Sequence, residues 1–484
     1  MTKDPKDGKD TASIPGEDLR EQGLDLPDML TGLQIVWASQ EWGRLGETTL
    51  IDSPKALSVG RGEESPGGHP RAFWAQQQPG EHRFMPPLRT TITSGDQLLV
   101  KAATRGLELN NIGKYPMHVN GRQVARGTVE PGDLVYLFGQ FLFQCVWRPV
   151  RMRRPQHLLT RFVGPFGEAN AFDMVGEGAM AASLKELLAY ASKSPEHVLL
   201  HGESGTGKES AAKMIHGMGP NPAAPFVKLS AANLSPSLLQ AQLFGHCADY
   251  PQMGMKARLG AFGAANGGTL FLDEIGRLPP EWQAALLRVL DQGEYMVLGE
   301  DKPARSHFRL IGAMNGPLAA LMLDLNKRLS LKIDVPGLID RLEDIPLLVR
   351  HLLRKTHASS PELTKHLLRK QVDGSEEVVP PVAFMEELML RRSFDGNVRD
   401  LLSAVSTMLY ETAPVQGGGE GEARVLTPSA ADEPYDAKGR MLTKEQIEWA
   451  LGKHGGNVSA AARELDVTRP SLYRAMERVG LRGR

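Results

Sequence analysis

Cysteine is nearly absent from this sequence. Its 484 residues include only Cys145 and Cys247, which do not form a paired or metal-binding spacing. This scarcity argues against a disulfide scaffold and a cysteine-ligated metal centre. No long apolar run occurs, and no apolar segment lies near Met1, so neither a membrane span nor a secretory leader is predicted. We therefore expect a cytoplasmic protein with no membrane partner.

The sequence also lacks a large excess of positive or negative charge, because its formal net charge is −1. A protein coated with nucleic acid along its whole length is therefore not expected, and any basic surface must be confined to one module. The hydrophobic content of 41% is ordinary for globular cores. At this length the chain predicts three or four domains.

Changes of composition along the chain predict its organisation. The first 25 or so residues have few large apolar side chains, which favours a flexible tail. Short apolar runs separated by turn signals then predict an all-β sandwich, and alternating strand and helix signals predict an α/β domain with a helical lid. The predicted segments are 1–44 flexible, 45–148 sandwich, 149–170 linker, 171–345 α/β domain, 346–412 helical lid, 413–440 flexible linker and 441–484 a small all-α unit.

A glycine-rich loop carries the strongest chemical signal. It reads Gly202-Glu203-Ser204-Gly205-Thr206-Gly207-Lys208 and directly follows the apolar run 198–200. Backbone N–H groups in such a loop can surround phosphates, the next helix adds its positive end, and a lysine reaches the terminal phosphates. A turn that merely connects a strand to a helix is the alternative. The pattern predicts a nucleotide site.

A second apolar run supports that prediction. Residues 267–272 lead into Asp273 and Glu274. A uniformly apolar strand suits a parallel sheet covered on both faces, and acids at its carboxyl end lie where such sheets bind ligands. Asp273 is predicted to hold Mg²⁺ against the phosphates, and Glu274 to orient the attacking water.

Taken together with Leu243-Phe-Gly-His246, these segments resemble the AAA+ domain of bacterial enhancer-binding proteins, the sigma-54-dependent transcription activators. The similarity extends over roughly residues 172 to 410. It implies an ATPase that works as a ring, usually a hexamer, with each ATP site completed by a neighbouring subunit. By the same resemblance, Asn315 reads the γ-phosphate, Arg399 senses nucleotide from the lid, and Arg328 is offered in trans.

Three single positions and one loop depart from the family pattern. Glu209 replaces the Ser or Thr that many such loops use for the metal, so metal coordination must differ there. Ser230 replaces an Asn that restrains the catalytic Glu, and Met322 replaces one of two trans arginines. The family's GAFTGA loop, which grips the sigma factor, is replaced by Asp-Tyr-Pro-Gln-Met-Gly at 249–254. We therefore do not expect ordinary remodelling of the sigma-54 polymerase holoenzyme.

The first module resembles a forkhead-associated (FHA) domain through Leu57-Ser-Val-Gly60-Arg61 and the many short strands that follow. The resemblance implies phosphothreonine binding by loops at one end, to which Arg61, Arg89 and Lys114 can supply charge-assisted hydrogen bonds. A degenerate sandwich used for protein contacts or ring control is equally open.

The last module resembles the Fis-type helix-turn-helix DNA-binding domain. Thr468 is a good helix N-cap, and Pro470 is tolerated in the first turn. We expect promoter or enhancer DNA to be contacted by the start of the second helix. The predicted DNA-contacting residues are Thr468, Arg469, Ser471, Tyr473 and Arg474.

Two functions follow. One is a DNA-bound AAA+ regulator that hydrolyses ATP and acts on transcription. The other is a nucleotide-gated DNA-binding regulator or repressor that does not engage sigma-54. The retained ATP-site residues favour the first, and the replaced loop favours the second.

Overall fold

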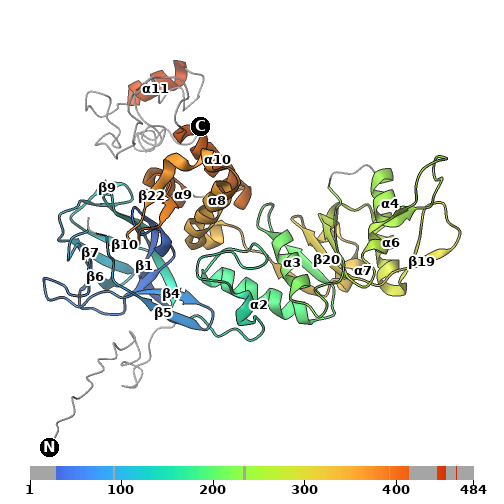
Figure 1. Ribbon diagram of the computed structural model, residues 1–484, viewed down its shortest axis with the longest axis horizontal. Helices are drawn as coiled ribbons and strands as arrows, with labels where there is room; N and C mark the ends of the chain where they lie inside the picture. Colours follow the sequence, from blue (N-terminus) through green and yellow to red (C-terminus); the bar gives the residue numbers. More distant parts are fainter. Residues whose placement is uncertain are drawn as a thin grey trace, which may run out of the picture. The chain divides into compact units, whose positions relative to one another are not determined.

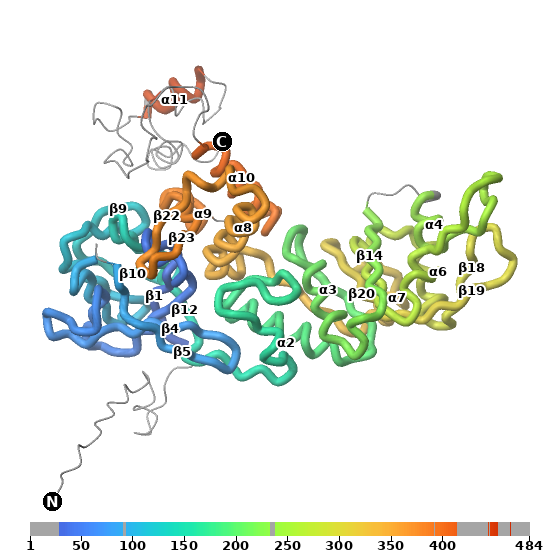
Figure 2. Tube along the Cα trace, in the orientation of Figure 1, coloured from blue at the N-terminus to red at the C-terminus, as the bar shows by residue number. Residues whose placement is uncertain are grey.

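The computed structural model describes residues 29–90, 93–232, 236–391, 393–413, 444–453 and 465. They form two compact units, one comprising the described residues up to 379 together with 389–411, and the other the described residues among 380–388 and 412–484. No helix of the described residues is both long and apolar enough to cross a membrane. Figure 1 gives the elements of each unit, and Figure 2 follows the same path as a Cα trace.

Two antiparallel sheets make up the N-terminal module, as predicted for an all-β domain. The first sheet has eight strands in the order β5-β4-β2-β1-β12-β11-β8-β9, and the second has four in the order β10-β7-β6-β3. Their bounds are β1 Met29–Ala38, β2 Thr48–Leu50, β3 Leu57–Val59, β4 Trp74–Gln78, β5 Glu81–Met85, β6 Leu98–Ala103, β7 Gly106–Asn111, β8 Met117–Val119, β9 Arg122–Gln123, β10 Arg126–Val129, β11 Leu134–Leu137 and β12 Phe141–Pro149.

The module begins earlier than predicted. Strand β1 starts at Met29, pairs with β12 over nearly its whole length, and buries Leu33 and Ile35 completely. The boundary at residue 45 is therefore wrong. Residues 29–38 are apolar without strict alternation, a pattern that indicates a strand less clearly than alternation does.

The predicted linker at 149–170 is also packed against the α/β domain. Glu186 accepts hydrogen bonds from the backbone N–H groups of Gln156, His157 and Leu158, at 2.7–3.0 Å. The side chain of Leu158 lies in the hydrophobic core formed with α2 (Ala179–Lys193) and α3 (Lys208–Gly217). This segment is thus part of the folded domain.

A five-stranded parallel sheet, ordered β14-β17-β20-β13-β21, forms the centre of the α/β domain. Its strands bury residues on both faces: Phe271 and Ile311 pack with α2 and α3, whereas Leu270 and Leu310 pack with the helices of the other face. The remaining bounds are β13 Val198–His201, β14 Phe226–Ser230, β17 Thr269–Asp273, β20 Arg309–Met314, β21 Leu331–Asp334, α4 Pro236–Phe244, α5 Ala261–Ala264, α6 Pro280–Gln292 and α7 Leu323–Arg328.

Two small hairpins extend from this domain. One pairs β15 (Gly245–His246) with β16 (Arg258–Leu259), and the other pairs β18 (Glu294–Met296) with β19 (Pro303–Arg305). A bridge between His246 and Leu298 ties the two hairpins together.

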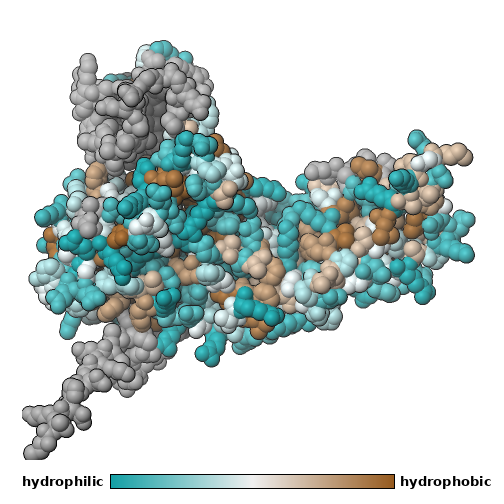
Figure 3. Space-filling view, viewed as in Figure 1, coloured by the Kyte–Doolittle hydropathy of each residue, from teal (hydrophilic) through white to brown (hydrophobic). Residues whose placement is uncertain are grey.

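The lid contains α8 (Ile345–Ser359), α10 (Val398–Thr412) and an unpredicted hairpin of β22 (Leu368–Lys370) with β23 (Glu376–Val378). In the second compact unit, the described helices are α9 (Val382–Met389), whose last residue belongs to the first unit, and α11 (Lys444–Lys453). On the viewed face the described surface is mainly hydrophilic, with hydrophobic residues in smaller patches (Figure 3).

Candidate nucleotide site

The glycine-rich loop leaves the carboxyl end of β13 and leads into α3, as predicted. Gly205 and Gly207 have φ angles of +79° and +100°, which favour glycine because it lacks a Cβ. The Lys208 ammonium donates hydrogen bonds to the backbone carbonyls of Gly202 and Glu203, both at 2.7 Å. The lysine is thus held over the loop by backbone groups.

Burial lowers the pKa of Lys208, while the nearby charges of Asp273 and Glu274 oppose that shift. Lys208 is 7% exposed and lines a cavity of about 330 Å³. The same cavity is lined by loop residues 204–209, Asp273, Glu274, Arg399 and parts of the lid. A cationic group and two carboxylates therefore line the same cavity, as a metal-bound triphosphate requires.

The predicted acids lie at the carboxyl end of β17. Glu274 has a φ of +55°, and its N–H donates to Asp273 Oδ1 at 3.1 Å. The Glu274 carboxylate lies 3.6 Å from the Arg277 guanidinium. Ser230 pairs in register with Asp273, but its hydroxyl accepts from Ala232 N at 3.4 Å, so the predicted bond to Glu274 stays a prediction.

Residues present in the cavity fit a magnesium-bound nucleotide. Asp273 supplies the hard carboxylate oxygen that Mg²⁺ prefers, and phosphate oxygens and water would complete the shell. Glu209 is drawn elsewhere: it pairs with Lys228 and, at 3.0 Å, with Lys213. The hydrogen bond from Lys228 is the main cause of its lowered pKa. Glu209 thus lines the cavity in place of the usual hydroxyl, with its carboxylate already paired to two lysines.

The lid reaches the glycine-rich loop directly. Arg399 donates to the Ser204 hydroxyl at 2.6 Å, and Val398 N donates to Gly205 O at 3.2 Å. Gly205 is also required sterically, because a Cβ there would lie 2.1 Å from Gly396 O. The predicted lid arginine and phosphate loop are thus brought together.

Asn397 is the strongest of these connections and was not singled out from the sequence. Its amide nitrogen donates to Glu203 Oε2 at 2.9 Å and to Ser204 O at 3.0 Å, while its amide oxygen accepts from Leu338 N at 2.6 Å. Asn397 is 1% exposed and has a φ of +53°. Its position after Gly396 was the available signal, because asparagine tolerates this backbone conformation better than most residues.

Arg341 provides a second unpredicted connection. It is buried, and its guanidinium donates to Thr206 O at 3.1 Å. Burial lowers its pKa, with Asp344 and Asp340 opposing the shift. The arginine thus fixes the loop from the side of the lid junction.

The far end of the cavity holds a further unpredicted cluster. The Asp173 carboxylate lies 3.1 Å from His351 Nε2 and 3.2 Å from Lys355 Nζ. Leu348 and Leu352, on the same helix α8, add apolar lining. One face of α8 therefore forms part of the nucleotide cavity.

Asn315 follows β20, whose last residue, Met314, accepts a hydrogen bond from Gly202 N at 3.2 Å. Asn315 thus lies at the sheet edge that carries the phosphate loop, but it does not line the cavity, so its predicted role stays a prediction. Arg328 is elsewhere. It ends α7 and pairs with Asp291 at 2.5 Å. It lies near the amino end of β13, where burial and, after it, the charge of Arg328 lower the pKa of His197. Arg328 does not line the nucleotide cavity of its own subunit.

Residues 249–254, in place of the expected sigma-gripping loop, form a closed turn between β15 and β16. Asp249 N donates to Met255 O at 2.9 Å, and Gly254 N donates to Asp249 Oδ1 at 2.7 Å. Met253 is 96% exposed. The turn is therefore ordered by its own aspartate and presents a methionine.

At one end of the N-terminal module, the loops predicted to bind phosphate come together. Arg61 N donates to Ser94 O at 3.0 Å, and Lys114 N donates to the Ser94 hydroxyl at 3.2 Å. Gly62 N donates to Leu88 O at 3.2 Å, which places Arg89 beside the same loops. Arg61, Arg89 and Lys114 are all exposed.

The five predicted DNA-contacting residues, Thr468, Arg469, Ser471, Tyr473 and Arg474, lie outside the described residues. A family model described as "Bacterial regulatory protein, Fis family" matches residues 440–478, which include all five, and confirms the type of the last module. A second family model, "Sigma-54 interaction domain", matches residues 174–335.

The chain is 35% identical over 324 residues to the transcriptional regulatory protein ZraR of Escherichia coli (strain K12), an alignment covering 65% of this chain and 70% of that protein. The chain belongs to the sigma-54 activator family. It is also similar to the anaerobic nitric oxide reductase transcription regulator NorR of Shigella dysenteriae serotype 1 (strain Sd197), with 32% identity over 349 residues, 68% of this chain and 66% of that protein. The family is one of enhancer-binding transcription regulators, which agrees with the predicted function.

Solved structures of NtrX from Brucella abortus also match. The ADP complex matches with 24% identity and a TM-score of 0.45, covering 64% of this chain and 70% of that one. The ATP complex matches with 25% identity and the same TM-score, covering 64% of this chain and 69% of that one.

Proposed function

We propose that this activator binds ATP with Mg²⁺ and hydrolyses it as an AAA+ ring, and that nucleotide turnover controls a transcription regulator held on DNA by its Fis-type module. The observation that carries the proposal is the shared cavity of Lys208, Asp273, Glu274 and Arg399. The cation, the proposed metal-binding acid, the proposed water-orienting acid and the proposed lid sensor thus line one cavity. This cavity lies at the sheet edge where α/β domains bind ligands.

Each group has a distinct task in phosphoryl transfer. Lys208 would leave its two backbone carbonyls and bind the terminal phosphates, because its charge is worth more to a phosphate than to a neutral carbonyl. Glu274 would orient the attacking water. Asp273 would hold Mg²⁺, which neutralises the charge that develops on the phosphate oxygens. Arg399 would exchange the Ser204 hydroxyl for the nucleotide and so report its presence to the lid.

The position of Arg328 supports the proposed ring. This arginine does not line the cavity of its own chain, yet it ends a helix in an exposed position. Its catalytic use is therefore in the site of a neighbouring subunit, as the family resemblance implies. Asp291 holds it until that neighbour binds.

The ATPase assignment is tested with two variants of the full chain. Lys208→Ala should abolish both nucleotide binding and hydrolysis, whereas Glu274→Gln should abolish hydrolysis and still bind nucleotide. Retained ATPase activity in either variant would refute the assigned site.

DNA binding is proposed to use Arg474 and its neighbours in the Fis-type module. Arg474→Ala should weaken binding to promoter or enhancer DNA and reduce its salt dependence, because one fewer phosphate contact releases fewer counterions. An unchanged salt slope would remove Arg474 from the interface.

A second candidate function concerns the partner rather than the chemistry. The turn at 249–254 differs in composition from the family's gripping loop, and its exposed Met253 is flanked by Asp249 and Pro251. This observation favours a nucleotide-gated regulator or repressor that does not engage the sigma-54 holoenzyme. A sigma-54 pull-down with a transition-state nucleotide mimic separates the two functions. Binding by the native chain contradicts the second function, and binding gained only after the family loop is grafted supports it.

The N-terminal module is proposed to be FHA-like and to bind phosphothreonine at the loops that carry Arg61, Arg89 and Lys114. Their convergence at Ser94 and Leu88 supports this proposal. A phosphothreonine peptide library should bind the native chain and bind Arg61→Ala less tightly. Equal binding of phosphorylated and unphosphorylated peptides would instead favour a sandwich used only for protein contacts.

A further inference from the structure

Residues 40–43, here called the coupling segment, connect the N-terminal module to the lid. Trp42 N donates to Gln371 Oε1 at 2.8 Å, and Val372 N donates to Gln40 O at 3.0 Å. Gln371 and Val372 belong to the turn of the lid hairpin β22–β23. The turn is thus hydrogen-bonded to the coupling segment from both directions.

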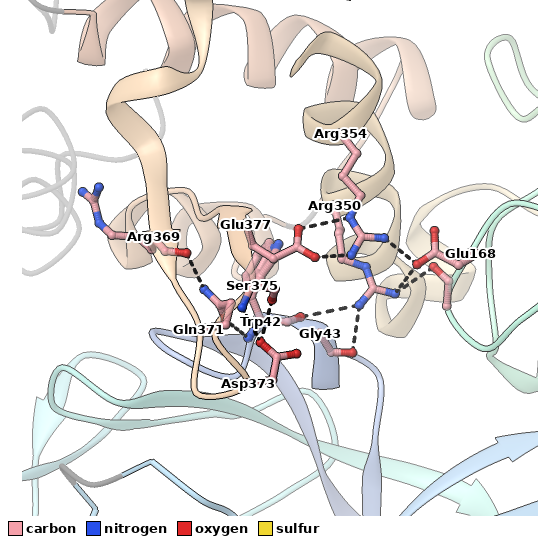
Figure 4. A network of polar contacts seen from close by, with 11 residues as sticks. Trp42, Gly43, Glu168, Arg350, Arg354, Arg369, Gln371, Asp373, Ser375 and Glu377 are labelled. Carbon is pink, nitrogen blue, oxygen red and sulfur yellow. Dashed lines mark hydrogen bonds and ion pairs between the residues drawn. The ribbon is translucent and has the colours of Figure 1, made fainter. Parts of the chain in front are cut away.

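Arg350 of α8 adds the most buried contact. Its side chain is 3% exposed and donates to Gly43 O at 3.1 Å and to Gly167 O at 3.0 Å. Trp42 O lies 3.5 Å from the same guanidinium (Figure 4). Burial lowers the pKa of Arg350 to about 10, so the group keeps its charge at neutral pH. A buried charge held by backbone carbonyls of the other module fixes α8 to that module.

The other side of the coupling segment contacts a loop that carries a predicted phosphate ligand. Glu41 Oε1 accepts from Arg89 N at 2.9 Å and from Thr90 N at 2.8 Å. The Thr90 hydroxyl donates to Gln40 Oε1 at 2.8 Å. Glu41 and Thr90 are both buried. The four residues of the segment therefore touch the loop on one side and the lid on the other.

Helix α8 extends this connection to the nucleotide. Arg350 and Arg354 lie on one face of the helix, and His351 and Lys355, which line the nucleotide cavity, lie on another. Leu347, one turn before His351, lies beside Gly46 of the N-terminal module, so that a Cβ at Gly46 would come within 3.3 Å of its side chain. A displacement of α8 on nucleotide binding should therefore also displace the coupling segment, since packed cores deform little.

We propose that residues 40–43 couple the loop at Arg89 and Thr90 to the nucleotide cavity, so that ligand binding at either place changes the order and affinity of the other. This inference rests on the proposed nucleotide function and adds the regulation of that site. Such coupling is reciprocal, because two sites that share one equilibrium must change each other's affinity by the same factor.

Hydrogen–deuterium exchange on the full chain, with and without ADP and Mg²⁺, tests the proposal. Nucleotide should slow exchange of the loop amides at 204–208 and also of the amides of Arg89 and Thr90, by about threefold or more. Arg350→Met should keep the protection at 204–208 and lose it at Arg89 and Thr90. It should also weaken ADP binding by about fivefold, the lower end of typical allosteric coupling.

Two further variants keep the test decisive. Gln371→Met removes the acceptor of Trp42 N at the edge of the same contact, and should lose the distant protection even if Arg350→Met does not fold. Arg354→Met is the matched control on α8, because Arg354 pairs with Glu168 and Glu377, which lie outside the N-terminal module. It should keep the distant protection.

The outcomes are distinguishable. Protection at 204–208 without any at Arg89 and Thr90 in the native chain would overturn the coupling and leave the nucleotide function intact. If nucleotide still protects Arg89 and Thr90 in both Arg350→Met and Gln371→Met, the coupling does not run through the coupling segment. No protection at 204–208 would end the proposed nucleotide function and the coupling with it.

Discussion

Replacement of Asn397 should separate the lid from the phosphate loop. In Asn397→Ala, Leu338 N loses its buried acceptor, and Glu203 and Ser204 lose their amide donor. An unsatisfied buried N–H costs about 1–3 kcal/mol, and a hydrogen bond to a charged group contributes about 1.5–3 kcal/mol. Alanine in a left-handed conformation adds about 1–2 kcal/mol. Together these contributions give an expected loss of about 3.5–8 kcal/mol at this junction.

Asn397→Gly isolates the side-chain contribution, because glycine adopts the φ of +53° without a Cβ penalty. It should be more stable than Asn397→Ala by about 1 kcal/mol and still far below the native chain. Thermal unfolding monitored by calorimetry, together with ADP titration, measures both effects. At about 2–4 °C per kcal/mol, Asn397→Ala should lower the Tm by about 10 °C or more.

ADP binding should fall in both Asn397 variants, since the lid would no longer be held over the loop. An Asn397→Ala protein with native Tm and native ADP affinity would refute the view that this amide joins lid and loop. Equal stability of the alanine and glycine variants would refute only the backbone part of the estimate.

Three other predictions follow from the same geometry. Gly205→Ala places a Cβ 2.1 Å from Gly396 O and should lower ADP affinity at least tenfold in calorimetry. The same change at Gly207, where a Cβ meets no neighbouring atom, should lower ADP affinity less. Equal losses of affinity in the two variants would contradict the lid contact. Arg328→Ala should lower the ATPase rate. Mixing it with Lys208→Ala subunits should restore part of the activity, because the Arg328→Ala subunit supplies an intact cavity and the Lys208→Ala subunit supplies the arginine. No restoration would argue against a trans role of Arg328. Burial raises the pKa of Glu177 above its ordinary 4.5, so its ionised form destabilises the fold at neutral pH. Glu177→Gln should therefore unfold at higher urea than the native chain at pH 7.5, with a difference that shrinks as the pH falls toward 4.5; a difference that grows on acidification would contradict the assignment.

The sequence predicted the parts of the site that depend on local pattern. The phosphate loop follows a buried strand, and Asp273 and Glu274 end another strand of the same parallel sheet, because carboxyl ends of parallel strands share one edge. The resemblance to enhancer-binding proteins supplied Arg399, and the structure brings it to Ser204. The loop and the two acids required only residue order and strand polarity, whereas Arg399 required the family pattern.

Contacts between distant segments could not be predicted in this way. Asn397 and Arg341 contact the phosphate loop from far along the chain, and Arg350 reaches Gly43 across a sequence separation of 307 residues. A lone arginine on a helix is ordinarily a solvated charge, and only the packed structure shows that Arg350 is enclosed. The early start of the first module had a similar cause, since β1 is identified by its partner β12 rather than by alternation.

Calorimetric titration of ADP and ATP, with Mg²⁺, into the folded full-length chain and into Lys208→Ala tests the central claim most directly. The account predicts one saturable nucleotide site per chain in the native protein and none in the variant. Well-folded native protein that shows no affinity for either nucleotide, or a variant that binds as tightly as the native chain, would contradict it.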